Sequence, residues 1–186
     1  MARRAAPDTR ERVLDTAATL FYEHGVRAVG MQQIIDAAGC GKNLLYREFP
    51  SKTDLVAGYL GRARERAVAA AAEESAADPA TRLVALVRGM GDEVRDPNYR
   101  GCPFRNYLAE FADHTDAPGQ IATAHLRDTR ARIDALVGEL GPARPDVLAD
   151  RIWLVVEGLY TAAAHPGGAH VADAAVSLVE DLIAAA

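Results

Sequence analysis

The chain has 186 residues, of which 49% are hydrophobic and 25% charged, and its formal net charge at pH 7 is −5. This composition is typical of a globular protein with length for one domain or two small ones, and it excludes a disordered chain. The apolar runs are too short to span a bilayer, two cysteines argue against a disulfide framework, and the N-terminus lacks the apolar segment of a secretory signal, so we expect a cytoplasmic protein.

The charge is unevenly distributed along the chain. Residues 1–54 hold 8 basic and 7 acidic residues, whereas the remainder holds 13 basic and 19 acidic residues. The excess of acid therefore lies outside the N-terminal part, and the net charge does not exclude a nucleic-acid partner for that part. Arg3 and Arg4 lie at its start, either on an arm that reaches DNA or on a solvated tail.

A first helix is predicted from Asp8 to about Gly25. Asp8-Thr-Arg-Glu11 has the form of a capping box, which typically begins a helix. Apolar residues follow it at helical spacing, namely Val13, Leu14, Ala17, Ala18 and Phe21. We expect this helix to brace the segment that comes next.

Residues 31–49 predict two short helices joined by a tight turn. The first helix has an apolar face and a polar face, namely Met31, Ile34, Ile35 and Ala38 against Gln32, Gln33 and Asp36. Gly39 ends it in the left-handed conformation, and Gly41 leaves room for the second helix. In the second helix Leu45 and Phe49 point inward, so an amide, a phenol and two cations share the outer face: Asn43, Tyr46, Lys42 and Arg47. Such a face suits phosphates and base edges, which indicates a DNA-reading helix-turn-helix.

These residues carry a family resemblance. Residues 9–60 resemble the DNA-binding domain of the tetracycline-repressor (TetR) family of bacterial transcription regulators. The matching motifs, all in one register, are Ala17-Ala18-x-Leu20-Phe21-x-x-x-Gly25, Ile34-x-x-Ala37-Ala38-Gly39, Leu45-Tyr46-x-x-Phe49 and Ser51-Lys52-x-x-Leu55. The resemblance implies an all-α homodimer that binds operator DNA and has no enzyme activity.

Three positions depart from the family pattern. Gly30 and Gly41 stand where a hydroxyl residue usually caps the following helix, which costs only a few tenths of a kcal/mol but removes a possible phosphate contact. Glu48 replaces a residue that is commonly aromatic or His. It either accepts from cytosine or turns away toward Arg47 or a neighbouring helix, and we favour the second alternative because phosphates repel a carboxylate.

The resemblance and the exposed face together give a candidate DNA contact set. We expect Lys42, Tyr46, Arg47 and Lys52 to hold phosphates, while Asn43, Leu44 and either Arg47 or Lys42 read bases. Gln32, on the outer face of the preceding helix, completes the set.

Six further helices are predicted beyond Pro50. Ser51 caps a long helix to about Glu74, Asp78-Pro79 opens one that ends at Asp96, and a short one spans about Phe104 to Ala112. The next follows Pro118-Gly119 and ends near Leu140, and another runs from Pro145 to about His165. The last begins near Ala169 and carries an apolar stripe to Ile183. Because the run from Ile152 to Ala164 is apolar on nearly all sides, we expect the last two helices to pair with their copies in a dimer.

The second half of the chain suggests a small-molecule site and no catalytic one. A mostly apolar pocket with a few orienting groups is typical of ligand sites, although any one of these residues is equally well explained as core. The candidates are Phe104, Asn106, Tyr107, Phe111, His125, Trp153 and Glu157. Cys102, His114, His125, Glu110 and Asp113 lack the spacing of metal ligands, and no nucleophile motif or phosphate loop is present, so we predict no metal, cofactor or catalysis.

The sequence thus predicts an all-α protein of about nine helices, with a helix-turn-helix DNA-binding domain in residues 1–54 and a ligand-binding and dimerisation domain in residues 55–186. The predicted function is that of a homodimeric repressor released from a palindromic operator by a small, mostly apolar effector. An activator or a thiol sensor using Cys102 is the alternative on the same fold. A helical ligand-binding dimer or enzyme without DNA binding is the alternative of another class.

Overall fold

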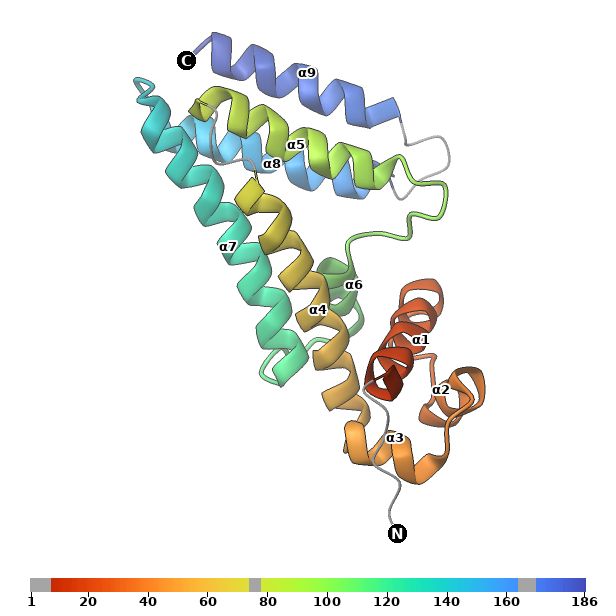
Figure 1. Cartoon of the computed structure of the whole chain (residues 1–186). Helices are drawn as coiled ribbons and strands as arrows, with labels where there is room; N and C mark the ends of the chain where they lie inside the picture. Colours follow the sequence, from red (N-terminus) through yellow and green to blue (C-terminus); the bar gives the residue numbers. More distant parts are fainter. Residues whose placement is uncertain (1–7, 74–77, 164–169) are drawn as a thin grey trace. The chain divides into compact units, whose positions relative to one another are not determined.

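The computed structural model describes residues 8–73, 78–163 and 170–186, and these residues form nine α-helices without any strand (Figure 1). The prediction of an all-α protein is confirmed. In chain order the helices are α1 (Asp8–His24), α2 (Met31–Ala38), α3 (Lys42–Glu48), α4 (Lys52–Glu73), α5 (Pro79–Val94), α6 (Pro103–Glu110), α7 (Ala117–Leu140), α8 (Pro145–Ala163) and α9 (Val171–Ala184).

The helices belong to two compact units. One comprises the chain up to Arg66 together with Pro103–His125, and the other comprises Ala67–Cys102 and Leu126–Ala186. The units therefore divide the long helices α4 and α7 between them. The predicted functional boundary at residue 54 is a different division, and it stays a prediction.

The first unit is built on the packing of α1 against α2 and α3. The buried apolar side chains of these helices and the start of α4 include Val13, Phe21, Ile34, Leu45, Phe49, Leu55 and Leu60. The apolar faces predicted from helical spacing include Val13, Phe21, Ile34, Leu45 and Phe49. Burying that face of α3 leaves the polar side of the same short helix toward solvent.

The second unit is a layer of three helices, α5, α8 and α9, that lie side by side in Figure 1 and pack on one another. Its core includes Leu83, Val87, Ile152, Val156, Leu159 and Val179. Asp78 caps α5 as expected, since its carboxylate accepts the backbone N–H of Thr81 at 3.1 Å.

Helix boundaries depart from the prediction at α6 and α7. The α7 helix begins at Ala117, before Pro118-Gly119, because the Asp116 carboxylate accepts the backbone N–H of Gly119 at 2.8 Å and so caps the helix. The α6 helix ends at Glu110, two residues earlier than expected. The predicted arm with Arg3 and Arg4, and the predicted helix ends at Glu74, His165 and Ala169, lie outside the described residues.

Candidate nucleic-acid interface and candidate ligand site

The turn between α2 and α3 has the geometry of a glycine helix stop. Gly39 adopts a left-handed conformation, with φ of 58°, and its N–H donates to the Asp36 carbonyl at 3.3 Å while the N–H of Cys40 donates to Ile35 at 3.2 Å. Gly30 and Gly41 precede α2 and α3 without a side-chain cap, as predicted. The turn therefore satisfies the Ile35 and Asp36 carbonyls near the end of α2, and α3 begins three residues after Gly39.

The outer face of α3 is polar and accessible. Lys42, Asn43 and Arg47 are exposed, and Tyr46 is 39% exposed although it is aromatic. Leu44 is half-buried. The Lys42 ammonium lies 6.0 Å from the centre of the Tyr46 ring, within the range of a cation–π contact. Four of the predicted DNA contacts are thus brought together on one face of one helix.

The other two predicted contacts, Gln32 and Lys52, belong to the helices before and after α3 in the sequence. Gln32 is exposed on α2, where its Nε2 donates to the Asp36 carboxylate at 2.8 Å. Lys52, the first residue of α4, is half-buried, and its Nζ donates to the Arg27 carbonyl at 3.5 Å. Burial lowers the pKa of Lys52, and the carboxylate of Glu110 opposes that change. An ammonium has three donors, so the bond to Arg27 leaves donors for a phosphate.

Glu48 turns toward its neighbour. The Nε and Nη2 atoms of Arg47 donate to the Glu48 carboxylate at 3.2 and 3.1 Å. This arrangement is the second of the two alternatives that the sequence left open.

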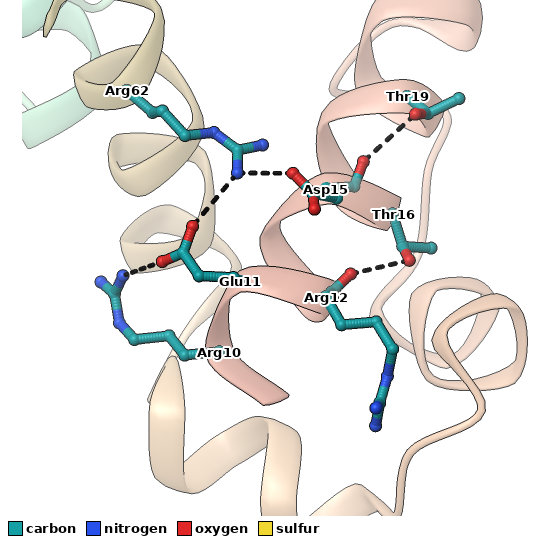
Figure 2. A network of polar contacts seen from close by, with 7 residues as sticks. All are labelled: Arg10, Glu11, Arg12, Asp15, Thr16, Thr19 and Arg62. Carbon is teal, nitrogen blue, oxygen red and sulfur yellow. Dashed lines mark hydrogen bonds and ion pairs between the residues drawn. The ribbon is translucent and has the colours of Figure 1, made fainter. Parts of the chain in front are cut away.

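An ion-pair cluster joins α1 to α4 (Figure 2). Arg62 of α4 places Nη1 at 2.6 Å from the Asp15 carboxylate and at 3.4 Å from that of Glu11, and Glu11 also faces Arg10 at 3.8 Å. Glu11 and Asp15 are four residues apart and so share one face of α1, which is the only sign of this cluster in the sequence. We define these residues as the Arg62 cluster.

A second polar contact joins α6 to the turn between α1 and α2. The Glu110 carboxylate accepts the backbone N–H groups of Val26 at 3.0 Å and Arg27 at 2.8 Å. The Arg27 guanidinium lies 5.0 Å from the centre of the Phe111 ring. Sequence reasoning missed this contact, because backbone donors leave no pattern in the sequence.

Four of the predicted ligand residues form stacked pairs in the first unit. Phe104 stacks on His125 with ring centres 3.8 Å apart, and Tyr107 stacks on Phe111 at 4.7 Å. Phe104 and Tyr107 are buried. The Tyr107 hydroxyl donates to Asp116 at 2.6 Å, and burial, followed by this bond, raises the pKa of Tyr107. Asn106 is half-buried on the same helix.

The remaining two candidates, Trp153 and Glu157, lie one turn apart on α8 in the second unit, and both are half-buried. The same unit has an open groove of about 400 Å³ between α5 and α9, whose lining includes Thr81, Val84, Arg88, Glu180 and Ile183. None of the predicted ligand residues lines this groove.

Large apolar side chains are exposed on the outer sides of α8 and α9. Leu154 is 68% exposed and Leu178 is 48% exposed. The single chain thus leaves part of this apolar surface uncovered, and the predicted pairing of α8 and α9 with a second copy stays a prediction. The sequence could not distinguish burial within one chain from burial against a second.

Three other observations concern the described part of the chain. No group of His, Cys, Asp and Glu in it could hold a metal ion. None of its helices is both long and apolar enough to cross a membrane. Neither cysteine is in a disulfide: Cys102 is buried, and Cys40 is half-buried in the helix-turn-helix turn.

Comparisons with known proteins show which family this chain resembles. Residues 13–59 match the family described as bacterial regulatory proteins, tetR family. An uncharacterized HTH-type transcriptional regulator of Mycobacterium tuberculosis is 30% identical over 161 residues, which cover 84% of this chain and 75% of that protein. The HTH-type transcriptional repressor KstR of Rhodococcus jostii is 29% identical over 81% of this chain and 71% of its own length.

A solved structure of a regulator has the same fold as this chain. The crystal structure of a TetR-family transcriptional regulator from Streptomyces coelicolor superposes with a TM-score of 0.87 at 28% identity, covering 95% of this chain and 94% of that one. The family is one of transcriptional regulators and not of enzymes. The motifs, the turn geometry and these relatives agree, and the chain belongs to the TetR family of helix-turn-helix transcriptional regulators.

Proposed function

We propose that this regulator is a homodimeric repressor that binds a palindromic operator through α3 and leaves it when a small, mostly apolar ligand binds. The observation that carries the DNA-binding part is the division of α3 into a buried face, Leu45, and an exposed face, Lys42, Asn43 and Arg47. The exposed side of this seven-residue helix does not contribute to the core, so its hydrogen-bond donors are accessible to DNA.

The contacts divide by chemistry. Lys42, Tyr46, Arg47 and Lys52 bind phosphates, because cations and a phenol suit the backbone of DNA. Asn43 reads adenine, since an amide forms two hydrogen bonds with its major-groove edge, and Leu44 contacts a thymine methyl group. Arg47 and Lys42 are also long enough to read guanine, and Gln32 contributes from α2.

The dimer is proposed to form through α8 and α9. Leu154 and Leu178 are exposed in the single chain, and a second copy would cover them in a four-helix bundle related by a two-fold axis. Two recognition helices related in this way read two half-sites of a palindrome. For successive major-groove faces they must lie roughly 34–36 Å apart.

The ligand is proposed to be small and mostly apolar. The candidate contacts in the first unit are the aromatic pairs Phe104–His125 and Tyr107–Phe111 together with Asn106, and those in the second unit are Trp153 and Glu157. Aromatic side chains with a few polar neighbours are typical of such sites. Repression is favoured over activation because KstR, a relative along most of its length, is named a repressor.

Sequencing the genomic fragments that the purified protein retains would test the DNA-binding part. The protein should enrich one palindromic sequence, and a reporter placed behind that sequence should be silenced when the protein is produced. Retention of fragments without any common sequence would contradict the proposal. Increased reporter expression would instead support the activator.

A further inference from the structure

We propose that Glu110 is a positioning residue for DNA reading: from α6, its carboxylate fixes the turn that leads into α2 and so orients the helix-turn-helix. The proposal rests on the proposed DNA-binding function. Glu110 lies more than sixty residues after α3 in the sequence, and no motif or resemblance assigned it a role in DNA binding.

The contact is specific in its geometry. Both carboxylate oxygens are used, since Oε1 accepts from Val26 at 3.0 Å and Oε2 from Arg27 at 2.8 Å. Hydrogen bonds from neutral N–H groups to a charged acceptor are stronger than bonds between neutral groups. The carboxylate therefore holds successive peptide groups of the turn in one orientation.

The turn is shaped to receive this carboxylate. Gly25 precedes Val26 with φ of +82°, and a Cβ atom at that position would lie 2.9 Å from the Glu110 Oε1 atom. Glycine alone combines that backbone conformation with that close approach. The Arg27 side chain lies over Phe111, the residue after Glu110, so the turn is held to α6 by a polar and an aromatic contact.

The same turn also reaches a proposed phosphate contact. The Arg27 carbonyl accepts from Lys52 Nζ at 3.5 Å, and the charge of Glu110 acts on the same ammonium. The Arg27 backbone thus donates its N–H to Glu110 and accepts a hydrogen bond from Lys52 at its carbonyl. Releasing the turn would loosen the entry to α2 and the position of the Lys52 ammonium together, while the buried faces of α1, α2 and α3 would still pack.

A positioning role and simple charge repulsion predict opposite changes in the affinity of the Glu110→Gln and Glu110→Ala variants for the selected duplex. Removing an acid near DNA should strengthen binding to any duplex, because repulsion from phosphates falls. If Glu110 positions the turn, affinity for the selected duplex should instead fall roughly tenfold, while a scrambled duplex should bind as well as before or better. Glu65→Gln, at an exposed position on α4, is the matched control and should change both affinities equally.

Amide hydrogen exchange of the full-length protein, measured by NMR without DNA, supplies the second readout. In both variants the Val26 and Arg27 amides should exchange at least about tenfold faster, whereas the Leu14 amide in α1 should keep its protection. Wild-type affinity for the selected duplex, or unchanged exchange at Val26 and Arg27, would overturn the proposal. A loss of protection throughout α1–α3 in Glu110→Gln would also overturn it, because the role would then be general stability. If the wild-type protein selects no duplex, the proposed function fails, and exchange still decides whether Glu110 holds the turn.

Discussion

Lys42 and Asn43 are adjacent, exposed residues in the first turn of α3, and they are expected to contribute differently to DNA binding. Where its ammonium contacts a phosphate, the first assignment for Lys42, the lysine acts as a point charge and carries no sequence information. An asparagine adds little charge interaction but presents a donor and an acceptor in the pattern that adenine matches. Their proximity makes them a controlled pair, since both substitutions disturb the same short helix.

Lys42→Ala should weaken binding to all duplexes by a similar factor and reduce the slope of log affinity against log salt concentration by about one contact. Asn43→Ala should keep the wild-type slope and relax the preference at one base position of each half-site, at a cost of about 1–3 kcal/mol for the preferred base. Affinities measured over a set of single-base operator variants at several salt concentrations check both. Exchanged phenotypes would reverse the assignment of these two residues.

At the scale of helices, the Arg62 cluster links α4 to α1, the helix on which α2 and α3 pack. Arg62 is largely buried while Glu11 and Asp15 are exposed, so water screens part of the attraction. The cluster is therefore expected to fix the register of α1 on α4 rather than to supply much of the stability of the protein.

Arg62→Met and Asp15→Ala, combined in a double-mutant cycle, should give a coupling free energy of about 0.2–1 kcal/mol in urea unfolding. Methionine keeps most of the aliphatic stem of the arginine and removes its charge. The coupling should shrink in high salt because screening weakens exposed ion pairs. A coupling of zero at low salt would show that the contact does not contribute to the folded state.

The outer faces of α8 and α9 give a prediction about assembly. Leu178→Arg would place an unpaired charge in a dry interface at a cost of several kcal/mol, so the variant should sediment as a monomer and lose operator binding. Val68→Arg is the matched control, because Val68 is 60% exposed on α4, outside the proposed interface, and this variant should remain dimeric. A monomeric wild-type protein at micromolar concentration would contradict the dimer.

Helical periodicity predicted the elements well because each helix buries one continuous apolar face, as Ile34 and Leu45 illustrate. It failed where a helix boundary or a contact depends on a polar group that no apolar spacing reveals. The start of α7 depends on the Asp116 carboxylate rather than on the following Pro118-Gly119 pair. The role of Glu110 depends on backbone donors 83 and 84 residues away in the sequence, which no spacing rule relates to it.

For the whole molecule, the proposed mechanism is a competition between DNA and ligand for two arrangements of the dimer. A ligand that favours a dimer with more widely separated recognition helices lowers operator affinity at both half-sites at once. By linkage, the operator lowers ligand affinity by the same factor, typically about 5- to 150-fold.

Variants of the candidate ligand residues should separate ligand response from DNA binding. A compound that raises the melting temperature of the wild-type protein, found in a panel of small apolar molecules, serves as the probe. Glu157→Gln, Tyr107→Trp and Trp153→Ala should each reduce release of operator by this compound, while operator affinity without the compound stays near that of the wild type. Unchanged release in all of these variants would place the ligand elsewhere.

The central claim is that this chain reads a specific DNA sequence, and the most direct test is the affinity of the wild-type protein for its selected palindrome and for a scrambled duplex over a series of salt concentrations. The palindrome should bind at least about 10³-fold more tightly at physiological salt, with two chains per duplex, and log affinity should fall linearly with log salt concentration for both duplexes. Equal affinities for the two duplexes, or binding that does not depend on salt, would contradict the claim.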